Sequence, residues 1–468
     1  MLLNIFLACR SFQTFNSSPN ILMISIDDLN DWIGVLGVNP NVKTPNIDRL
    51  AREGILFTNA HCQAPICGPS RASLLSGLRP STTGIYGQIR DENLRKAHPI
   101  LNQISFLPEY FANNGYKTLG VGKIFHGHSP SGVFQVSGGR INGFGPKPKE
   151  FFKWSKKGTS TDWGIFPNQD SLMYDFNYAN WAKNELEKNH NSPFFLALGF
   201  IRPHVPWYAP KKWFDLYPIE DISLPKYDPN DYDDLPQIAK DIAYRGMMPT
   251  TDWAIKNGEW KYIVQAYLAC ISFVDHQVGV VLNALEKSVY KENTIVVLWS
   301  DHGYEIGEKG TFGKHTLWSE STKVPLIIKL PWIKGGKKIK NPVELLDLYP
   351  TLLEVTSLPK NPLNEGKSLV SLINGKTEGS GIAITTYGIN NHSLVNKTHR
   401  YIRYEDGSEE LYDLINDPGE RNNIANQDGS NIIKRNFIKY IPSLNEPWSS
   451  SSYNTVNDYF RRTSNTED

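Results

Sequence analysis

Short apolar stretches of strand length recur along the chain and are separated by helix-like segments. The clearest are Asn20–Ile26, Lys117–Gly122, Phe194–Phe200 and Thr294–Ser300. Their length and nearly continuous hydrophobicity are typical of buried strands. Strands that are buried on both faces are typical of a parallel sheet. Because these strands alternate with helical segments, the pattern predicts an α/β domain with a largely parallel central sheet.

The pattern changes towards the C-terminus. Residues 401–413 alternate between apolar and polar positions as a hairpin does, which predicts a smaller domain with an antiparallel sheet and a terminal helix. We place the main domain at residues 19–376 and the C-terminal subdomain at residues 377–468. The last stretch, residues 448–468, is rich in Ser, Asn and Thr, and we expect it to be loosely held.

Each of the four predicted strands is followed by polar or ionisable residues. In open α/β sheets, ligands bind outside the carboxyl ends of the strands. Any one of these residues could be a turn, a helix cap or a satisfied structural histidine, but their coincidence at one edge predicts a shared site. The residues are Asp27 and Asp28, Lys123 and His126, Arg202 and His204, and Asp301 and His302.

The acidic strand ends predict a metal site. Asp27, Asp28 and Asp301 offer carboxylate oxygens and His302 one imidazole, a donor set that suits Ca²⁺ or Mg²⁺ better than a soft metal. Neighbouring residues on a regular strand point to opposite faces, so Asp27 and Asp28 can share an ion only if the strand breaks there. A divalent ion would also remove the repulsion between these acids.

Three cations from separate motifs, Arg71, Lys123 and Lys314, are candidates for an oxyanion site. Arginine can bond two oxygens at once, and lysine acts as a point charge. The alternative is three solvated surface charges. The neighbouring metal ligands favour the anion site.

The segment Cys67-Gly68-Pro69-Ser70-Arg71 predicts a helix start, because Pro69 suits a first helical turn and Gly77 suits the end. Cys67 would then lie at the positive end of the helix, where a thiolate is stabilised. Three interpretations stay open: an inert buried cysteine, a thiol nucleophile activated by histidine, or a side chain that is chemically converted into the attacking group.

Composition excludes several classes of protein. The chain has 468 residues, 49 of them basic and 48 acidic. We therefore expect no overall positive electrostatic field that would attract nucleic acid. The four cysteines, at positions 9, 62, 67 and 270, form no CxxC pair, which indicates neither a zinc site nor a disulfide scaffold.

Residues 2–9 are apolar and end in Leu-Ala-Cys, which is typical of an export signal that ends in a lipid-modified cysteine. No basic residue precedes this short stretch, so the alternative is that the segment is not an export signal. We treat residues 1–18 as a candidate signal remnant and expect an exported protein: periplasmic, secreted, or an outer-membrane lipoprotein. No later run approaches the roughly 18 apolar residues of a membrane span, so no transmembrane segment is expected.

The Cys67–Arg71 segment, followed by Leu-Ser-Gly-Leu-Arg, closely resembles the signature of type I sulfatases, in which this cysteine is oxidised to Cα-formylglycine. Other motifs are similar, in the same order, to the iduronate-2-sulfatase-like branch, which acts mainly on sulfated sugars. They occupy residues 27–29, 44–50, 122–126, 202–207, 300–303, 313–318 and 410–420.

The resemblance implies an alkaline-phosphatase-like fold: a large mixed, mostly parallel central sheet flanked by helices, with a smaller C-terminal α+β subdomain that contains an antiparallel sheet. It implies a sulfuric ester hydrolase with formylglycine at position 67 and one ion, Ca²⁺ or Mg²⁺, held by Asp27, Asp28, Cys67, Asp301 and His302. The implied partners are a sulfated polysaccharide or oligosaccharide, algal or glycosaminoglycan-type, and a formylglycine-generating or anaerobic sulfatase-maturating enzyme.

The resemblance also implies roles for the remaining residues. The hydrated formylglycine attacks sulfur, while Arg71, Lys123 and Lys314 neutralise charge on the sulfuryl oxygens. His204 protonates the leaving alcohol, and His126 helps remove the second diol proton so that sulfate is expelled. Candidate contacts to the sugar at the rim of the pocket are Arg202, Trp207 and His315.

One departure from the branch follows the Asp301-His302-Gly303 motif. Where the branch often has an aromatic residue and then His-Leu-Gly, this chain has Tyr304-Glu305-Ile306-Gly307. An acid at the pocket rim could contact sugar hydroxyls, but we expect Glu305 to be solvated. Two other functions stay open: a phosphate or phosphonate ester hydrolase of the same superfamily, and a sulfated-glycan-binding protein left unmatured at Cys67.

Overall fold

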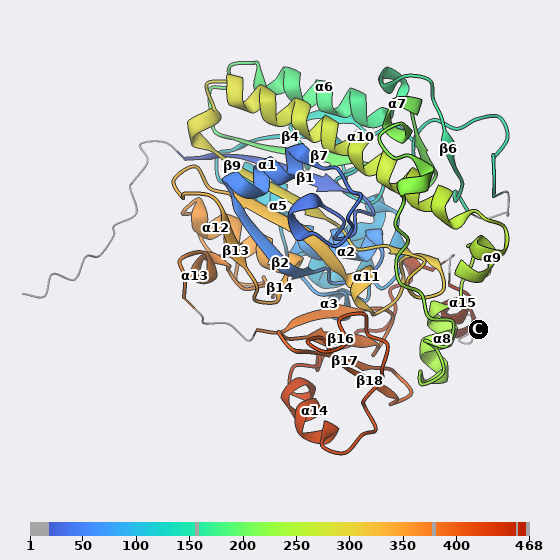
Figure 1. The fold of residues 1–468 in the computed structure, drawn as a ribbon. Helices are drawn as coiled ribbons and strands as arrows, with labels where there is room; N and C mark the ends of the chain where they lie inside the picture. Colours follow the sequence, from blue (N-terminus) through green and yellow to red (C-terminus); the bar gives the residue numbers. More distant parts are fainter. Residues whose placement is uncertain (1–17, 155–158, 377–380, 455–456, 465–468) are drawn as a thin grey trace, which may run out of the picture.

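The computed structural model describes residues 18–154, 159–376, 381–454 and 457–464, and its centre is a nine-stranded mixed sheet (Figure 1). The order is β13-β2-β12-β9-β1-β7-β4-β5, with β14 beside β2. Among these strands, β12 runs antiparallel to both neighbours and the other pairs are parallel, which confirms the predicted sheet. The strands are β1 (Asn20–Ile26), β2 (Ile55–His61), β4 (Lys117–Gly122), β5 (Val136–Gly139), β7 (Phe194–Phe200), β9 (Thr294–Ser300), β12 (Lys323–Lys329), β13 (Lys337–Ile339) and β14 (Val343–Glu344).

The four strands predicted from apolar runs, β1, β4, β7 and β9, have the predicted bounds. They are adjacent in the order β9-β1-β7-β4 and parallel to one another. Their carboxyl ends therefore meet at one edge of the sheet, as the clustering of polar residues after them indicated.

Helices cover both faces of the sheet, because alternate residues of each central strand point to opposite sides. In β1, Leu22, Ile24 and Ile26 join the core formed with α1 (Pro45–Glu53), α6 (Tyr174–Leu186) and α10 (Trp260–Lys287). Ile21 and Met23 join the opposite core, formed with α2 (Cys67–Ser76), α5 (Leu107–Asn113) and α12 (Leu348–Val355). Figure 1 shows α6 and α10 lying together across the first face.

The helix α10 is the one described helix that is long and apolar enough, by length and composition, to cross a membrane. Its most apolar window has a mean hydropathy of 1.5, and 83% of that window is buried inside the protein. A buried core helix passes the same test, and α10 packs against α6 and α1 in the core on one face of the sheet.

The C-terminal part contains a separate antiparallel sheet, β15-β16-β17-β18 (Figure 1). Its strands are β15 (Ala383–Thr386), β16 (His392–Val395), β17 (His399–Arg403) and β18 (Glu409–Asp413), followed by α14 (Ser430–Ile438). The hairpin β17–β18 confirms the predicted alternation of residues 401–413. The domain limit at 376 and 377 stays a prediction, and residues 377–380 lie outside the described part of the chain.

The expectation that residues 448–468 are loosely held was wrong for the part that the structure describes. Strand β19 (Ser452–Tyr453) pairs with β3 (Gln88–Ile89) of the main domain. The Trp448 ring lies 5.5 Å from Tyr86, and the buried Phe460, in α15 (Asp458–Ser464), lies 4.7 Å from Tyr387. These aromatic side chains anchor a segment whose overall composition is polar.

Shorter elements connect the main ones. They are α3 (Pro80–Thr83), α4 (Leu94–Ala97), α7 (Lys211–Phe214), α8 (Gln237–Ala243), α9 (Thr251–Lys256), α11 (Ser319–Thr322), α13 (Val370–Ile373), the pair β6 (Trp163–Ile165) and β8 (Trp207–Ala209), and the pair β10 (Glu305–Ile306) and β11 (Phe312–Gly313).

Candidate active site

The turn after β1 brings two acids into one space. Asp28 has a left-handed backbone, with φ of 61°, so the strand breaks where a shared ion requires it. The Asp28 N–H donates to Oδ1 of Asp301 at 3.2 Å, and the Leu29 N–H donates to Oγ of Ser300 at 3.1 Å. The end of β1 is thereby fixed to the end of β9, which carries Asp301 and His302.

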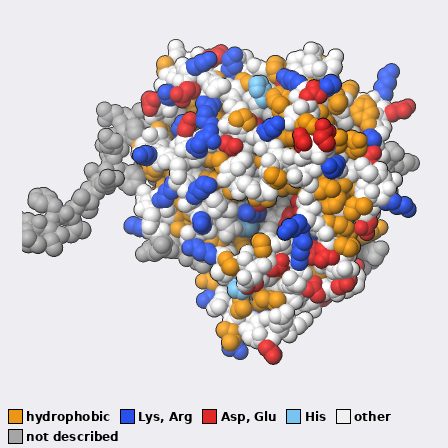
Figure 2. Space-filling model, viewed as in Figure 1, with side chains coloured by type: hydrophobic (Ala, Val, Ile, Leu, Met, Phe, Trp, Pro, Cys, Tyr) orange, Lys and Arg blue, Asp and Glu red, His pale blue; other side chains and the backbone are white. Residues whose placement is uncertain are grey.

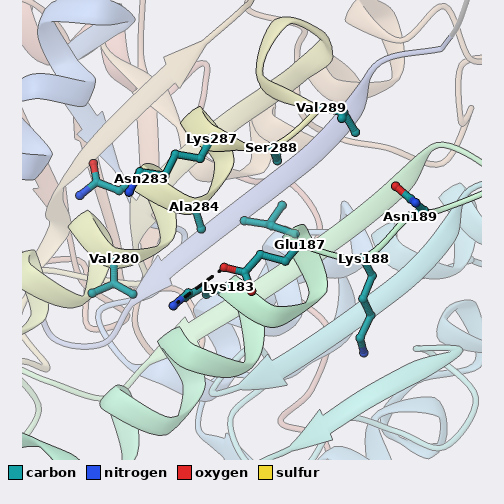
Figure 3. A pocket seen from close by; sticks show the side chains of 11 residues that line it. Lys183, Glu187, Lys188, Asn189, Val280, Asn283, Ala284, Lys287, Ser288 and Val289 are labelled. Carbon is teal, nitrogen blue, oxygen red and sulfur yellow. Dashed lines mark ion pairs between the residues drawn. The ribbon is translucent and has the colours of Figure 1, made fainter.

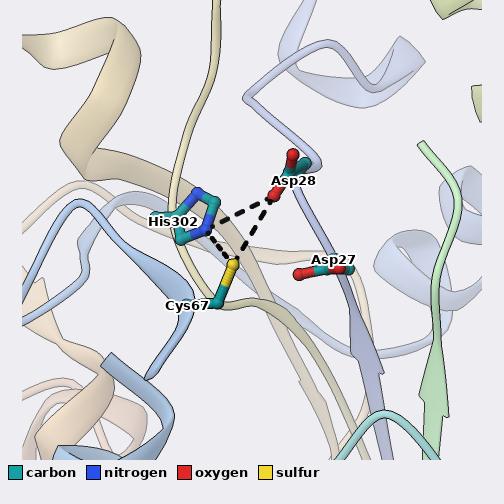
Figure 4. A group of neighbouring side chains, drawn as sticks. All are labelled: Asp27, Asp28, Cys67 and His302. Carbon is teal, nitrogen blue, oxygen red and sulfur yellow. Dashed lines mark hydrogen bonds and ion pairs between the residues drawn. The ribbon is translucent and has the colours of Figure 1, made fainter. Parts of the chain in front are cut away.

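Four side chains converge at this edge: Asp27, Asp28, Cys67 and His302 (Figure 4). Their ligand atoms lie within 4.8 Å of one another, and all four residues are buried. Nε2 of His302 is 3.2 Å from Sγ of Cys67 and 3.4 Å from Oδ1 of Asp28. Asp301 joins them, with its Oδ1 at 3.6 Å from the same Nε2. The donors fit a hard cation with one imidazole ligand.

An unpaired oxygen marks the place for this cation. Oδ2 of Asp28 is buried and has no hydrogen-bond partner among the described residues. Burying a charged oxygen without a partner is costly, and a bound ion removes the cost. Burial raises the pKa of Asp28 to about 7, with Lys314 opposing the shift and Asp27 and Asp301 adding to it. Lys314 therefore does not offset the burial of Asp28 and its repulsion by the other two acids.

His302 is prepared to act as a neutral ligand. Its Nδ1–H donates to the carbonyl of Gly303 at 2.8 Å, which leaves the lone pair on Nε2, facing the cluster. Burial lowers the pKa of His302 to about 4, although Asp301 opposes the shift. At neutral pH the ring is uncharged and its free nitrogen points at the ion site.

The three predicted cations all lie around this cluster and are buried. Nζ of Lys314 is 2.6 Å from Oδ1 of Asp28 and 3.0 Å from Sγ of Cys67. Lys123 forms an ion pair with Asp27, and Nε of Arg71 donates to Oδ2 of Asp301 at 2.7 Å. The alternative of three solvated surface charges is therefore wrong.

Asp27 is held in its charged form by these cations. Burial opposes ionisation, but Lys123 and Arg71, and His204 when its ring is protonated, hold the pKa of Asp27 well below its usual range. Arg71 also donates to the carbonyls of Lys123 and Ile124, so its guanidinium fixes two carboxylates and the end of β4 at once.

Helix α2 begins at Cys67 and ends before Gly77, whose φ of 77° closes it, as predicted. The expected stabilisation of a thiolate was wrong. Burial raises the pKa of the Cys67 thiol to about 12, although Lys123 and Lys314 oppose the shift. Such a thiol is protonated at neutral pH, which disfavours the interpretation as a histidine-activated thiol nucleophile.

Two further histidines flank the cluster. His204 follows β7, stacks on Phe144 with ring centres 4.0 Å apart, and places Nε2 at 3.9 Å from Oδ2 of Asp28. Its Nδ1–H donates to the carbonyl of Val205 at 2.6 Å, and burial holds the pKa of His204 well below its usual range. The half-buried His126 follows β4, and its backbone N–H donates to Asp91.

Two of the predicted rim contacts are buried side chains, and their role in binding the sugar stays a prediction. The guanidinium of Arg202 is 1% exposed and donates to the carbonyls of Phe144, His204 and Tyr208. Trp207 is fully buried and packs against Tyr267 and Tyr304. Both residues hold the loop that carries His204, because a buried arginine can close several backbone carbonyls at once.

Glu305 does not lie at a rim, so neither a sugar contact nor a solvated acid describes it. It is fully buried and forms an ion pair with Arg245 at 3.1 Å. Thr316 and Ser321 also donate hydrogen bonds to it. His315, the third predicted rim residue, is buried directly after Lys314.

Several supporting residues carried no signal in the sequence. Oγ of Ser70 donates to the carbonyl of Asp301 at 2.5 Å, and the hydroxyl of Tyr267 donates to the carbonyl of Asp28 at 2.8 Å. Phe144 and Arg245 are far from the motifs along the chain. Only Ser70 belongs to a motif, so contacts that depend on packing between distant segments were missed.

A pocket of about 460 Å³ lies away from this site, beside the ends of α6 and α10 (Figure 3). Lys183, Glu187 and Lys287 are among the residues that line it. The two helix ends lead into the starts of β7 and β9, so this pocket lies at the opposite edge of the sheet from the cluster.

The chain matches two family models. The sulfatase model matches residues 19–358, and the model described as N-sulphoglucosamine sulphohydrolase, C-terminal, matches residues 307–446. A sulfatase of Formosa agariphila is 50% identical and the match covers 97% of this chain and 93% of the relative.

Further relatives and a solved structure are more distant. Mouse iduronate 2-sulfatase is 33% identical over 73% of this chain and 69% of the relative. An ulvan-active sulfatase of Formosa agariphila is 28% identical over 93% of this chain and 84% of the relative. The crystal structure of a phosphonate monoester hydrolase of Agrobacterium radiobacter has a TM-score of 0.74 at 21% identity, covering 91% of this chain and 95% of that one.

Proposed function

Because the chain belongs to the sulfatase family and is a sulfuric ester hydrolase, we propose that it removes sulfate from sulfated carbohydrates with a formylglycine made from Cys67. One observation carries the proposal. Sγ of Cys67 lies 3.0 Å from Nζ of Lys314 and 3.2 Å from Nε2 of His302, inside a cluster of metal-binding donors. A group at position 67 is therefore within reach of both the Lys314 ammonium and an ion.

The donor set supports Ca²⁺, with Mg²⁺ as the alternative, held by Asp27, Asp28, Asp301, His302 and the oxygen at position 67. When bound, the ion supplies Lewis acidity to that oxygen, and the hydrated formylglycine supplies the attacking hydroxyl. The remaining chemistry belongs to the side chains of the chain itself.

Lys314 contacts position 67, and Lys123 acts on it through its charge, so both favour the sulfuryl oxygens as these gain charge in the transition state. Arg71 forms ion pairs with Asp27 and Asp301 and thereby orients both carboxylates. His204 can deliver a proton through Nε2 to the leaving alcohol, because its Nδ1–H is already committed to Val205. The negative charge of a bound sulfate ester favours the protonated ring that this step requires.

His126 takes the second proton of the hydrated aldehyde, so that sulfate can leave. Its position three residues after Lys123, at the same strand end, supports this assignment. Burial, with Lys123 adding to the effect, holds the pKa of His126 well below its usual range, so the ring is neutral and able to accept a proton.

The carbohydrate substrate is supported by the relatives. Two of them are named for sugar substrates, iduronate and ulvan. A sugar alkoxide is a poor leaving group, which agrees with a histidine placed to protonate it. We expect a sulfate ester on a uronic acid, galactose or deoxysugar of a polysaccharide or its oligosaccharides.

Two alternatives have weaker support. The likeness to a phosphonate monoester hydrolase, at 21% identity, is a likeness of fold. A sulfated-glycan-binding protein without activity would have no need for the buried acids and cations that the site retains, since such groups are costly to bury.

Export and maturation complete the proposal. The apolar residues 2–9, which lie outside the described part of the chain, suggest a periplasmic, secreted or lipid-anchored protein. A formylglycine-generating or anaerobic sulfatase-maturating enzyme is the required partner.

The face drawn in Figure 2 carries acidic and basic side chains together, in line with the balanced charge of the chain.

The experiment is expression of the full chain together with a maturating enzyme, followed by assays on aryl sulfate, aryl phosphate and a panel of sulfated oligosaccharides. We expect sulfate release, loss of the thiol mass in the peptide that contains residue 67, and loss of activity on chelation of the ion. Active protein with an unmodified thiol at position 67 would contradict the mechanism. Faster hydrolysis of phosphate than of sulfate esters would contradict the function.

A further inference from the structure

Two buried side chains beside Lys314 have hydrogen-bonding groups that the fold leaves unused. Arg245 is 4% exposed and His315 is 5% exposed. Among the described residues, no partner in good geometry meets Nε or Nη1 of Arg245, or either ring nitrogen of His315. Leaving a buried donor unsatisfied is costly, most of all on a charged group, so four such atoms on two residues beside a lysine of the active site are candidates to bind a ligand.

The chain places both residues next to the catalytic lysine. His315 follows Lys314 directly, and its backbone, with φ of 82°, is held by a hydrogen bond from its N–H to the carbonyl of Pro65 at 3.0 Å. Arg245 lies against Gly313, on the other side of Lys314: a Cβ atom at Gly313 would lie 3.3 Å from Cζ of Arg245. The guanidinium is thus packed on the segment that carries Nζ of Lys314 to 3.0 Å from Cys67.

Glu305 holds the guanidinium on one side only. Its Oε2 accepts from Nη2 of Arg245 at 3.1 Å, while its Oε1 accepts from Thr316 and Ser321. The acid is therefore fixed by three partners and orients Arg245, so that Nε and Nη1 remain for another acceptor. This arrangement also explains the departure of the chain from its branch at position 305: the acid serves as an anchor for the arginine.

We propose that Arg245 and His315 form a subsite for a second anionic group of the sulfated sugar, either a uronate carboxylate or a further sulfate. The proposal rests on the proposed function, and it names the substrate class as sugars that carry a negative charge besides the sulfate that is removed. Arginine donates to both kinds of oxyanion, and the neutral imidazole of His315 adds one N–H. Glu305 balances the charge of Arg245, but the unused N–H groups of the guanidinium form stronger hydrogen bonds with an oxyanion than with a neutral hydroxyl.

The kinetic test compares Arg245→Gln and Arg245→Lys with the parent enzyme on four substrates. These are an aryl sulfate, a monosulfated neutral hexoside, the matching monosulfated uronide, and a disulfated hexoside. We expect Arg245→Gln to lower kcat/KM about 10- to 100-fold, mainly through KM, on the uronide or the disulfated sugar, and to change the other two substrates by less than about 2-fold. Arg245→Lys restores part of the loss, because it keeps the charge without the planar fork.

The pattern across substrates separates the two sources of the anion. A loss confined to the uronide assigns a carboxylate, and a loss confined to the disulfated sugar assigns a sulfate. His315→Gln follows the same pattern with a smaller loss, about 3- to 10-fold. An equal loss on all four substrates, aryl sulfate included, would show a structural role and overturn the subsite, as would no loss on any.

Two further variants control for folding. Arg79→Gln removes another mostly buried arginine, which is bonded to Glu344 through both terminal nitrogens at 2.7 Å, and is expected to lower Tm without changing the ratio between substrates. The double variant Arg245→Gln/Glu305→Gln removes both charges of the buried pair, so that no acid is left unpaired if Arg245→Gln alone fails to fold.

A binding experiment separates the subsite from the proposed function. The Ca²⁺-loaded Cys67→Ala chain, which does not turn over, is titrated with a methyl uronide, a methyl hexoside, and a monosulfated and a disulfated hexoside while Tm is measured. We expect the uronide to raise Tm more than the hexoside, or the disulfated sugar to raise it more than the monosulfated one, and this difference to disappear with Arg245→Gln. If the parent enzyme releases no sulfate from any sugar, the proposed function fails, whereas a difference in Tm that does not depend on Arg245 overturns the subsite.

Discussion

Burial acts on the reactive residues in opposite directions according to their charge. It raises the pKa of the Cys67 thiol to about 12 and lowers the pKa of His302 to about 4, so both groups are neutral at pH 7. The negative charge of the cluster is then confined to the aspartates, and the sulfur has no tendency to act as a thiolate. This division of charge agrees with an oxygen nucleophile at position 67 and an ion between the acids.

Replacing Cys67 by Ala removes the proposed nucleophile without filling or crowding the site. We expect turnover of any sulfate ester to fall at least about 1,000-fold, because the loss of a nucleophile abolishes the covalent route, with Tm changed by only a few degrees. Sulfate release and thermal unfolding measure the two effects. Cys270→Ala, at another buried cysteine, is the matched control and should keep its activity. Activity retained by Cys67→Ala would exclude the assignment.

Binding of Ca²⁺ should weaken as the pH falls below 7. The ion requires deprotonated Asp28, whose pKa burial raises to about 7, against the effect of Lys314. Protons therefore compete for Asp28 below that pH, whereas His302, with a pKa of about 4, does not compete until the solution is far more acidic. At pH 5.5 the affinity should be roughly 30-fold lower than its plateau above pH 7. Calorimetric titrations of the metal-free protein between pH 5.5 and 8 measure it, and a flat profile would contradict the assignment of Asp28.

At the scale of elements, the ends of β4 and β7 approach so closely that both need glycine. A Cβ at Gly199 would overlap the carbonyl of Lys123, and a Cβ at Gly122, whose φ is 79°, would overlap the carbonyl of Gly199. The Lys123 N–H donates to the Gly199 carbonyl at 2.8 Å across the same contact. The position of the Lys123 ammonium against Asp27 thus depends on the absence of side chains on the neighbouring strand.

Gly199→Ala should therefore displace Lys123. Because the obstacle is backbone rather than a flexible side chain, we expect a loss of stability of about 2 to 4 kcal/mol and a loss of activity that persists well below Tm. Gly115→Ala is the matched control: its φ is 86°, but nothing lies within 4 Å of the added methyl group. Gly115→Ala should lower the free energy of unfolding by about 1 kcal/mol and leave kcat unchanged. Equal behaviour of the two variants in chemical denaturation and kinetics would contradict the argument.

The strands were predictable from sequence because each is buried on both faces, which leaves an uninterrupted apolar run such as that of β9. The acids and histidines after these runs were predictable for the same reason, since parallel strands end at one edge. The burial of Trp207 and Glu305 was not predictable, because their contacts come from segments distant along the chain. From sequence alone, Glu305 is predicted to be a solvated acid, because its ion pair with Arg245 forms only in the folded chain.

At the scale of the whole molecule, the C-terminal sheet is joined to the main domain by a buried ionic network. Arg400 on β17 pairs with Glu420 at 2.6 Å and donates to Oγ of Ser319 at 2.9 Å. Glu420 also accepts from the N–H of Ser319 at 2.9 Å. Ser319 begins α11, shortly after Lys314 and His315. The C-terminal part therefore supports the segment that carries two residues of the site.

Removing Phe460 should test how far the last segment contributes. The ring is 2% exposed and lies 4.7 Å from Tyr387, which in turn lies 6.0 Å from His315. We expect Phe460→Ala to lower the free energy of unfolding by about 3 to 5 kcal/mol, through the lost contacts and the cavity. Val289→Ala, at a side chain that is 82% exposed, is the control and should change it by less than about 0.5 kcal/mol. Chemical denaturation provides the comparison, and similar values for both variants would mean that the segment is not anchored.

The depth of Cys67 has a consequence for the order of events in the life of the chain. Its side chain is 1% exposed, in the first turn of a helix that is buried along its whole length. If Cys67 is converted to formylglycine as proposed, the enzyme that oxidises this sulfur has to contact the residues around it before the sheet and helix α2 enclose them. A chain that folded first would keep its thiol and stay inactive, so the yield of active enzyme would depend on the relative rates of conversion and folding.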